Sequence, residues 1–139
     1  SGDQDNFNLN DCSTQRNLNE EGREQAKRIG ELFTNNNIKI KKEFSSEWCR
    51  CKETAEIAFK DYSTKNFLNS FYSSKYAKNK KKQIEELDNF VKQLKSSKNL
   101  VFVTHYVLIS EVLNYAPSSG EIVVSDKNFN IIGSIEINY

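Results

Sequence analysis

The chain has 139 residues, of which 37% are hydrophobic and 28% charged, and its formal net charge at neutral pH is +1. This length fits one domain of ordinary size, and the balanced charge gives no reason to expect nucleic acid or an anionic membrane surface as a partner. No apolar run approaches the roughly 18 residues of a membrane-spanning helix, so no span is expected.

The first half of the chain predicts a loop, a helix, a strand and a second helix. Residues 1–16 are rich in Asp, Asn, Gly and Ser, which favours a loop. Either Asn17 or Asn19 is expected to cap the helix that follows, because both side chains can accept hydrogen bonds from its first turn. The apolar stripe of this helix comprises Ala26, Ile29, Leu32 and Phe33. A short strand is expected within residues 38–45, and a helix from Trp48 or Cys49 to Phe59.

The second half predicts an irregular stretch, a helix, a strand, a short helix and two antiparallel strands. In the stretch 61–79, four apolar residues are expected to tuck under the domain: Phe67, Leu68, Phe71 and Tyr72. Helical spacing links Ile84, Leu87, Val91 and Leu94, and the lysines of 78–82 are interpreted as the solvated start of that helix. The apolar run 100–103 predicts a buried strand. A short helix carrying Leu108 and strands over 121–125 and 130–138 complete an α/β layered domain.

Three cysteines, Cys12, Cys49 and Cys51, leave two interpretations open. With one histidine and no Cys-x-x-Cys spacing they offer too few ligands for a convincing zinc site, so no metal is expected. They are either small buried thiols or include a disulfide from Cys12 to Cys49 or Cys51. A bridge would indicate an oxidising, periplasmic or exported setting, and its absence the cytoplasm.

Arg50 and His105 are the residues whose placement points to chemistry. Arg50 falls in the first turn of a predicted helix, where its guanidinium fork and the helix N–H groups can face the same anion. His105, the only histidine, follows a strand, where open α/β sheets place their ligands. Taken alone, each is better explained as a surface arginine or as a core or capping histidine; together they predict a pocket for an anion. Arg16 could reach the same pocket or be a plain loop residue.

Three motifs resemble those of the histidine phosphatase (phosphoglycerate mutase-like) superfamily. Residues 15–26 are similar to its L-T-x-x-G-x-x-Q-A helix start, with Asn19 where Thr is usual. Residues 46–55 match its S-x-x-x-R-x-x-x-T-A helix, and residues 101–105 match the strand that ends in its second histidine. The motifs come in the family's order and cover most of the chain, and the sequences around Cys12 and Trp48 suggest a subgroup of small bacterial members. The resemblance implies a three-layer α/β/α sandwich with a mostly parallel central sheet, and no cofactor.

The resemblance also implies phosphomonoester hydrolysis through a phosphohistidine, with a phosphorylated small molecule or phosphate as ligand. His105 would be the second histidine, which stabilises charge on the transferring phosphoryl group, and Arg50 would clamp the phosphate. The family's nucleophilic histidine ends a first strand in an Arg-His-Gly type motif that this chain lacks. We therefore expect a single, N-terminally incomplete domain that is inactive alone, with that strand preceding Ser1. The proton donor stays unassigned, since Asp61 is the only acid between Lys60 and Gln83.

We expect the missing strand to be central in the sheet, between the strands that carry Ser46 and His105.

Two alternatives to an enzyme stay open. One is a non-catalytic phosphate-binding or interaction module of the same fold, and the other is a plain α/β protein with a structural His105. The sequence indicates neither the substrate nor the oligomeric state.

Overall fold

The computed structural model describes residues 5–95 and 97–137, so the expectations for residues 1–4, Ser96 and residue 138 lie outside the described residues. The helices and strands, in chain order, are α1 (Glu20–Asn35), β1 (Ile40–Ser45), α2 (Cys49–Phe59), β2 (Ser63–Thr64), α3 (Lys80–Gln93), β3 (Asn99–Val103), α4 (Tyr106–Leu113), β4 (Ile122–Ser125) and β5 (Ile131–Ile135). Short 3₁₀ helices span Cys12–Thr14, Asn66–Leu68 and Ala77–Asn79. The predicted element order is confirmed, with the short strand β2 in the irregular stretch.

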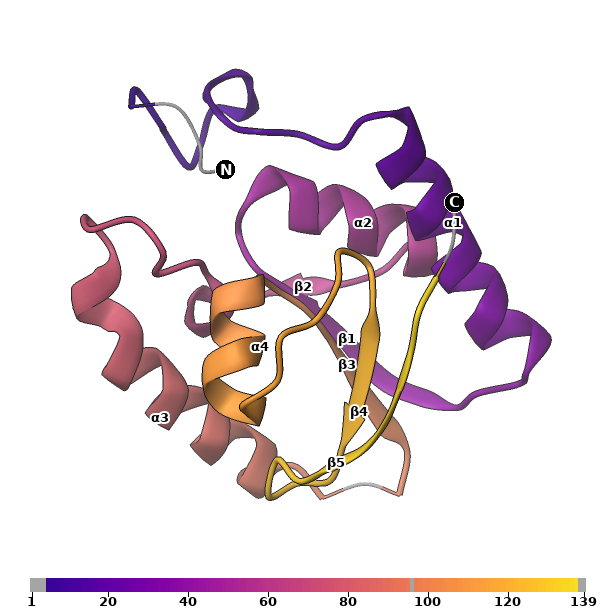
Figure 1. Ribbon diagram of the computed structural model, residues 1–139. Helices are drawn as coiled ribbons and strands as arrows, with labels where there is room; N and C mark the ends of the chain where they lie inside the picture. Colours follow the sequence, from indigo (N-terminus) through magenta and orange to yellow (C-terminus); the bar gives the residue numbers. More distant parts are fainter. Residues whose placement is uncertain (1–4, 96, 138–139) are drawn as a thin grey trace.

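The elements form the three layers expected, with a mostly parallel central sheet. Strands β2, β1 and β3 are parallel and hydrogen-bonded in that order, and β4 and β5 form an antiparallel pair. Helices α1 and α2 pack against each other on one face, and α3 and α4 lie on the other (Figure 1). Gly30 permits the close approach of α1 and α2, because an added Cβ would lie 2.4 Å from the carbonyl oxygen of Ala58.

Side-chain caps explain where the first helix begins. The side-chain oxygen of Asn19 accepts a hydrogen bond from the backbone N–H of Gly22 at 2.8 Å, which satisfies a donor that the first helical turn leaves open. Asn17, the other predicted cap, instead donates its side-chain amide to the carbonyl oxygens of Cys12 and Gln15. The Asn19 prediction is confirmed, and the Asn17 alternative is wrong because that side chain orders the preceding loop.

The core lies between the three-stranded sheet and α3. It consists of Phe44, Phe67, Leu68, Phe71, Leu87, Val91 and Leu108. Phe44 stacks on Phe102 at 5.6 Å and meets the edge of Phe90 at 5.0 Å between ring centroids. The irregular stretch thus supplies core residues as expected, except that Tyr72 is 72% exposed.

The strands that carry Ser46 and His105 are direct neighbours, so the expected central strand does not lie between them. Phe44 pairs with Phe102 and Ser45 with Val103, and the N–H of Ser46 donates to the carbonyl oxygen of Val103 at 2.9 Å. The sheet is instead interrupted at the other edge of β3. In the described part of the chain, β3 pairs with β1 alone and β4 pairs only with β5, so the two sheets are not joined. For the same reason residues 100–103, predicted to be buried, are half-buried.

The β4–β5 pair is attached to the rest of the domain at both of its ends. The Gln25 side-chain amide, on α1, donates to the carbonyl oxygens of Ser119 and Ile137 at 3.0 and 2.9 Å. Gly120, with φ +79°, makes this possible, because a Cβ there would fall onto the Gln25 side chain. At the hairpin turn, the ammonium group of Lys127 donates to the carbonyl oxygen of Leu94 at 2.7 Å.

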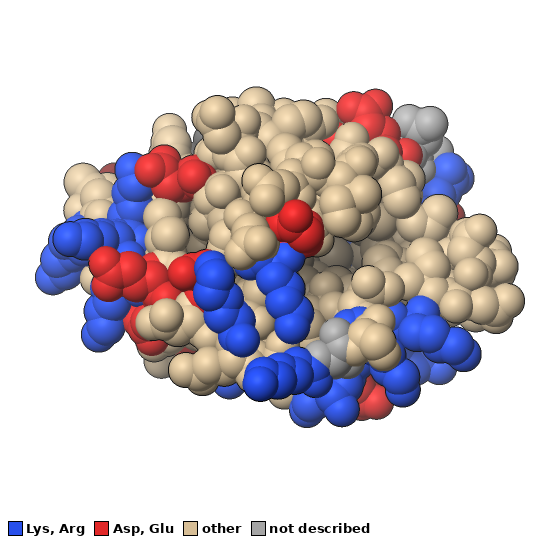
Figure 2. Space-filling view, turned by 90° about the horizontal axis from the view of Figure 1, so that it is seen from below, with Lys and Arg blue, Asp and Glu red and all other residues tan. Residues whose placement is uncertain are grey.

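Charged side chains are distributed unevenly over the surface. Seen from below, Lys, Arg and some acids gather at the left, near the middle and along the lower part of the view, and mostly uncharged side chains cover the upper middle and the right (Figure 2). The lysines of 78–82 are exposed at the start of α3, and Lys80 forms an ion pair with Glu111 at 2.9 Å. No helix in the described part of the chain combines the length and the apolar character that crossing a bilayer requires.

Candidate anion-binding site

The site lies where β1 and β3 end. Because these strands are parallel and adjacent, their carboxyl ends bring Ser46 and His105 together across 58 intervening positions, at the edge where α/β sheets bind ligands. The hydroxyl oxygen of Ser46 lies 2.8 Å from Nε2 of His105. Ser46 is 0% exposed and His105 6% exposed, so this contact is shielded from water.

The partners of Ser46 determine which nitrogen of His105 carries the proton. The hydroxyl lies 3.1 Å from the side-chain oxygen of Asn69, which can only accept, and it accepts from the N–H of Trp48 at 3.1 Å. Asn69 is oriented by Glu47, whose N–H donates to its oxygen and whose carboxylate accepts from its amide. Since the single hydroxyl proton goes to Asn69, the contact with His105 requires a proton on Nε2 of the neutral ring.

Arg50 lies against the other nitrogen of the same imidazole. Its Nη2 is 3.4 Å from Nδ1 of His105, which acts as the acceptor in the neutral ring, and its Nη1 is 3.4 Å from the carbonyl oxygen of Arg16. Arg50 is half-buried in the first turn of α2, whereas Arg16 is exposed. All three residues line one cavity of about 1820 Å³. The structure therefore places the Arg50 guanidinium group beside Nδ1 of His105 and the backbone of Arg16 beside Arg50.

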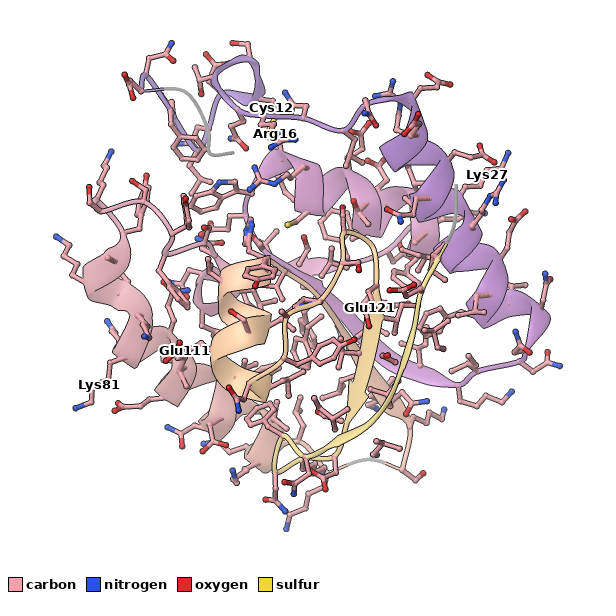
Figure 3. The ribbon with its side chains drawn as sticks, in the orientation of Figure 1. Cys12, Arg16, Lys27, Lys81, Glu111 and Glu121 are labelled. Atoms are coloured by element: carbon pink, nitrogen blue, oxygen red, sulfur yellow. A yellow bond between two sulfur atoms is a disulfide. The ribbon has the colours of Figure 1, made fainter. Side chains whose placement is uncertain are left out.

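A disulfide holds the Arg16 loop over the start of α2. Cys12 is bonded to Cys49, which confirms one of the two predicted pairings, and Cys51 is a buried thiol with its sulfur 3.7 Å from Nε2 of His105. Figure 3 shows Cys12 and Arg16 close together at the start of α2. The side-chain oxygen of Gln15 accepts from the N–H of Cys49 at 2.9 Å.

The first N–H groups of α2 are consequently engaged within the protein. Cys49 donates to Gln15, and the preceding N–H groups of Trp48 and Glu47 donate to Ser46 and Asn69. The N–H of Cys49, the first of α2, is therefore not available to the anion that the sequence predicts there. Positive charge at the site comes from the guanidinium group of Arg50.

An aromatic wall closes one side of the site. Trp48 is 3% exposed and meets His105 edge-on, with ring centroids 5.3 Å apart. Phe7 stacks on Trp48 at 4.9 Å, and Tyr76 meets it at 5.6 Å. The wall limits rotation of the imidazole and excludes water from one face, which strengthens electrostatic interactions inside the site.

Sequence reasoning missed the residues that orient His105. Ser46 was visible as the first position of the S-x-x-x-R motif, but its bond to the histidine follows only from the pairing of β1 with β3. Asn69 and Gln15 gave no sequence signal. Asp61, considered as a proton donor, is exposed and is not among the residues that line the cavity, whereas Asp5 and Glu121 are. Among the described residues, no group of three His, Cys, Asp or Glu side chains could hold a metal ion.

Comparison with known proteins places this geometry in context. Residues 10–69 match the model of the histidine phosphatase superfamily (branch 1). The crystal structure of TTHB049 from Thermus thermophilus is 18% identical, with a TM-score of 0.65 over 87% of this chain and 85% of that one. The structure of the open reading frame Rv3214 from Mycobacterium tuberculosis is 13% identical, with a TM-score of 0.54 over 88% and 84%. No curated protein gives a significant match. The structural likenesses extend over nearly the whole chain and show a phosphoglycerate mutase-like fold.

Proposed function

We propose that the chain is a member of the histidine phosphatase superfamily, whose model matches residues 10–69, and that it forms the larger part of a phosphomonoesterase that works through a phosphohistidine intermediate. The observation that carries the proposal is the 3.4 Å contact between Nη2 of Arg50 and Nδ1 of His105 at the carboxyl edge of the sheet. A guanidinium fork beside a histidine nitrogen suits an anion with several oxygens, as in a phosphorylated small molecule.

In the proposed reaction, His105 stabilises charge and does not attack phosphorus. Its Nε2 is taken by Ser46, so only Nδ1 can meet the substrate. When the ring is protonated, Nδ1–H donates to a phosphoryl oxygen, while Arg50 holds two further oxygens and Arg16 adds positive charge. The attack forms a P–N bond as the P–O bond to the leaving group breaks, and water then cleaves the P–N bond.

The nucleophile is proposed to come from polypeptide that precedes Ser1. His105 is the only histidine of the chain, and one imidazole cannot both attack phosphorus in line and stabilise the charge that develops on it. On this proposal residues 1–139 are most of a single domain whose catalytic strand lies upstream, and they have no turnover by themselves.

A non-catalytic phosphate-binding module is the second candidate. The observation that favours it concerns two acids: Asp61 lies outside the cavity, and Glu121, which lines it, bonds the hydroxyl group of Tyr115 and the N–H of Ser118. Such a module would use Arg50 and His105 to hold a phosphate group without transferring it.

Hydrolysis of p-nitrophenyl phosphate tests the proposal. The 139-residue chain should show no turnover, and a version extended with its natural upstream residues should be active. His105→Ala should abolish that activity. Equal, metal-independent activity in both proteins, abolished by His105→Ala, would make His105 the nucleophile and refute the proposal. Binding of vanadate by the extended protein without turnover would favour the non-catalytic module.

A further inference from the structure

We propose that the end of the domain opposite the anion site docks onto an anionic lipid surface. This end, here called the lysine face, is defined by five exposed lysines and two exposed isoleucines: Lys39, Lys41, Lys42, Lys95, Lys127, Ile131 and Ile132. The inference is independent of the proposed function, because it concerns the other edge of the sheet and needs no reaction at Arg50 or His105.

Three of the lysines gather where β1 and β3 begin. The carbonyl oxygen of Lys39 accepts hydrogen bonds from the backbone N–H and the side-chain amide of Asn99, the first residue of β3, at 3.2 and 3.0 Å. Lys41 and Lys42 follow near the start of β1, and both are exposed. Because β1 and β3 are parallel and the anion site lies at their carboxyl ends, these lysines lie at the opposite edge of the sheet.

The segment before β3 and the β4–β5 turn bring two further lysines to the same end. Lys95 lies between α3 and β3, directly after Leu94, whose carbonyl oxygen accepts a hydrogen bond from the ammonium group of Lys127 in the turn. Both lysines are exposed. None of the five lysines forms an ion pair with another described residue, so no carboxylate neutralises them directly.

Positive charge exceeds negative charge at this end of the molecule. The carboxylates on the same segments are Glu43, which is half-buried on β1, and Asp126, whose carboxylate accepts from the N–H groups of Asn128 and Asn130 in the turn. Five cations therefore stand against two anions, although the whole chain carries only +1. Figure 2 looks onto this end, with Lys and Arg near the middle and along the lower part of the view. The fold thus creates a local field that the overall charge conceals.

Exposed aliphatic side chains lie beside the lysines. Ile131 and Ile132 begin β5 directly after the turn and are 42% and 71% exposed. No residue of β5 is charged. Lysines next to exposed aliphatic groups are the combination that an acidic bilayer surface binds, since the ammonium groups meet the lipid headgroups and the aliphatic groups are buried at the boundary with the acyl chains.

The composition of the lysine face suits nucleic acid less well. Proteins that bind nucleic acid use arginine forks on bases and phosphates, and aromatic rings that stack on bases. The exposed rings of Tyr72 and Tyr106 line the cavity of the anion site. The four arginines of the chain lie at that site or on α1: Arg16, Arg23, Arg28 and Arg50. Isoleucine gains free energy from hydrocarbon and not from a phosphate backbone, so we assign the face to lipid.

Co-sedimentation of the 139-residue chain with lipid vesicles tests the inference. Vesicles of phosphatidylcholine mixed with phosphatidylserine should carry the protein into the pellet, whereas vesicles of phosphatidylcholine alone should leave it in solution. High salt should weaken binding to the acidic vesicles, because exposed charges are then screened. Equal sedimentation with both kinds of vesicle, or with neither, would overturn the inference.

Charge removed from the lysine face should matter more than the same charge removed elsewhere. The test variant combines Lys41→Gln, Lys42→Gln and Lys95→Gln. The control variant combines Lys78→Gln, Lys81→Gln and Lys82→Gln at the start of α3, where Lys81 points away from the β4–β5 turn (Figure 3). The test variant should lose on the order of 100-fold in its partition coefficient on acidic vesicles, and the control much less. An equal loss in both would assign the binding to overall charge and overturn the inference.

A single substitution separates lipid from nucleic acid as the partner. Ile132→Ser should weaken binding to acidic vesicles by about tenfold. Tyr72→Ser, at a position that is 72% exposed, is the matched control and should bind normally. A fluorescent duplex oligonucleotide should show no binding in fluorescence anisotropy at physiological salt. Oligonucleotide binding that is lost in the lysine test variant, together with vesicle binding that is insensitive to Ile132→Ser, would make the partner nucleic acid and overturn the inference.

Discussion

At the residue scale, the orientation of His105 depends on a hydroxyl group buried beneath it. The hydroxyl oxygen of Ser46 accepts a hydrogen bond from Nε2–H of the imidazole, and its O–H donates to the side-chain oxygen of Asn69, which leaves Nδ1 turned to Arg50. Ser46→Ala should therefore release the ring and remove the preference for the Nε2–H form. Nitrogen-15 NMR of the imidazole measures this preference directly.

The neighbouring serine provides a matched control for that variant. Ser45 is as deeply buried, but its hydroxyl group donates to the carbonyl oxygen of Ser46. Ser45→Ala should cost a similar free energy of unfolding, about 1 kcal/mol for one hydrogen bond, and leave the tautomer unchanged. A wild-type ring protonated at Nδ1, or a tautomer insensitive to Ser46→Ala, would contradict the assignment.

Arg50 should contribute to anion binding through the shape of its guanidinium group as well as through its charge. Both Arg50→Ala and Arg50→Lys should weaken vanadate binding to the upstream-extended protein by roughly 2–4 kcal/mol, because lysine cannot present two parallel N–H groups to the anion. Isothermal titration calorimetry measures the loss. Arg28→Lys, in an exposed pair with Glu24 at 3.8 Å, is the control and should bind normally. Normal affinity in both Arg50 variants would make Arg50 an ordinary helix residue.

Arg50 and His105 could be predicted from the sequence, but the side chains that orient the site could not. Arg50 and His105 stand out because each follows the end of a predicted strand, and the parallel pairing of β1 with β3 then brings those ends together. Ser46, Asn69 and Gln15 act through side-chain contacts across 23 to 59 positions of the sequence. Such contacts depend on strand register and loop path, which no local pattern determines.

At the element scale, the Cys12–Cys49 disulfide fixes the loop that carries Arg16. In the chain-entropy model, a bridge between cysteines 37 positions apart stabilises the fold by about 4 kcal/mol. Reduction should lower the free energy of unfolding by about this amount, as urea denaturation with and without reductant would show. Cys49→Ser should remove the dependence on reductant, and Cys51→Ser should keep it. Three free thiols in the unreduced, denatured protein would contradict the pairing.

The β4–β5 pair should respond to acid. The hydrogen bond from Tyr115 lowers the pKa of Glu121 below its usual 4.5, and the N–H of Asn130 lowers the pKa of Asp126 below 3.8. A lowered pKa in the folded state means that the stabilisation is present at higher pH and is lost as pH falls through the folded-state value. NMR shifts of Gly133 should therefore change in acid before those of α1.

Alkaline pH should weaken the hydrogen bond between Tyr115 and Glu121 by ionising the tyrosine. The hydrogen bond to Glu121 raises the pKa of Tyr115 above 10.0. The stabilisation from this bond is therefore fully present below pH 10.0 and is lost as the pH rises through the folded-state pKa of the phenol. Glu121→Gln keeps an acceptor oxygen and removes the carboxylate charge, so it should abolish its share of the acid response. An unchanged acid response in Glu121→Gln combined with Asp126→Asn would show that other groups control the pair.

Most elements were predictable because their sequence patterns are local. The stripes of α1 and α3, and the breaks after them, needed no knowledge of the fold. The position of the sheet interruption was not predictable, because it depends on which strands pair. The half-exposure of residues 100–103 has the same origin, since an apolar run predicts burial without saying whether the covering element is present.

At the scale of the whole molecule, the chain combines a candidate anion-binding site with an interrupted sheet. Arg50, Arg16 and His105 line the same cavity as the open edges of β3 and β4. In the proposed function, the polypeptide upstream of Ser1 would bring the nucleophile to Nδ1 of His105. The central claim of the proposed function is that the attacking histidine lies outside residues 1–139 and that His105 stays unphosphorylated.

Mass spectrometry of the phosphoenzyme tests this claim most directly. The upstream-extended protein, quenched at alkaline pH during turnover of a phosphomonoester, should carry an acid-labile phosphoryl group on a histidine of the extension. The 139-residue chain, treated identically, should carry none, and His105 should be unmodified in both proteins. A phosphoryl group on His105, in either protein, would contradict the account.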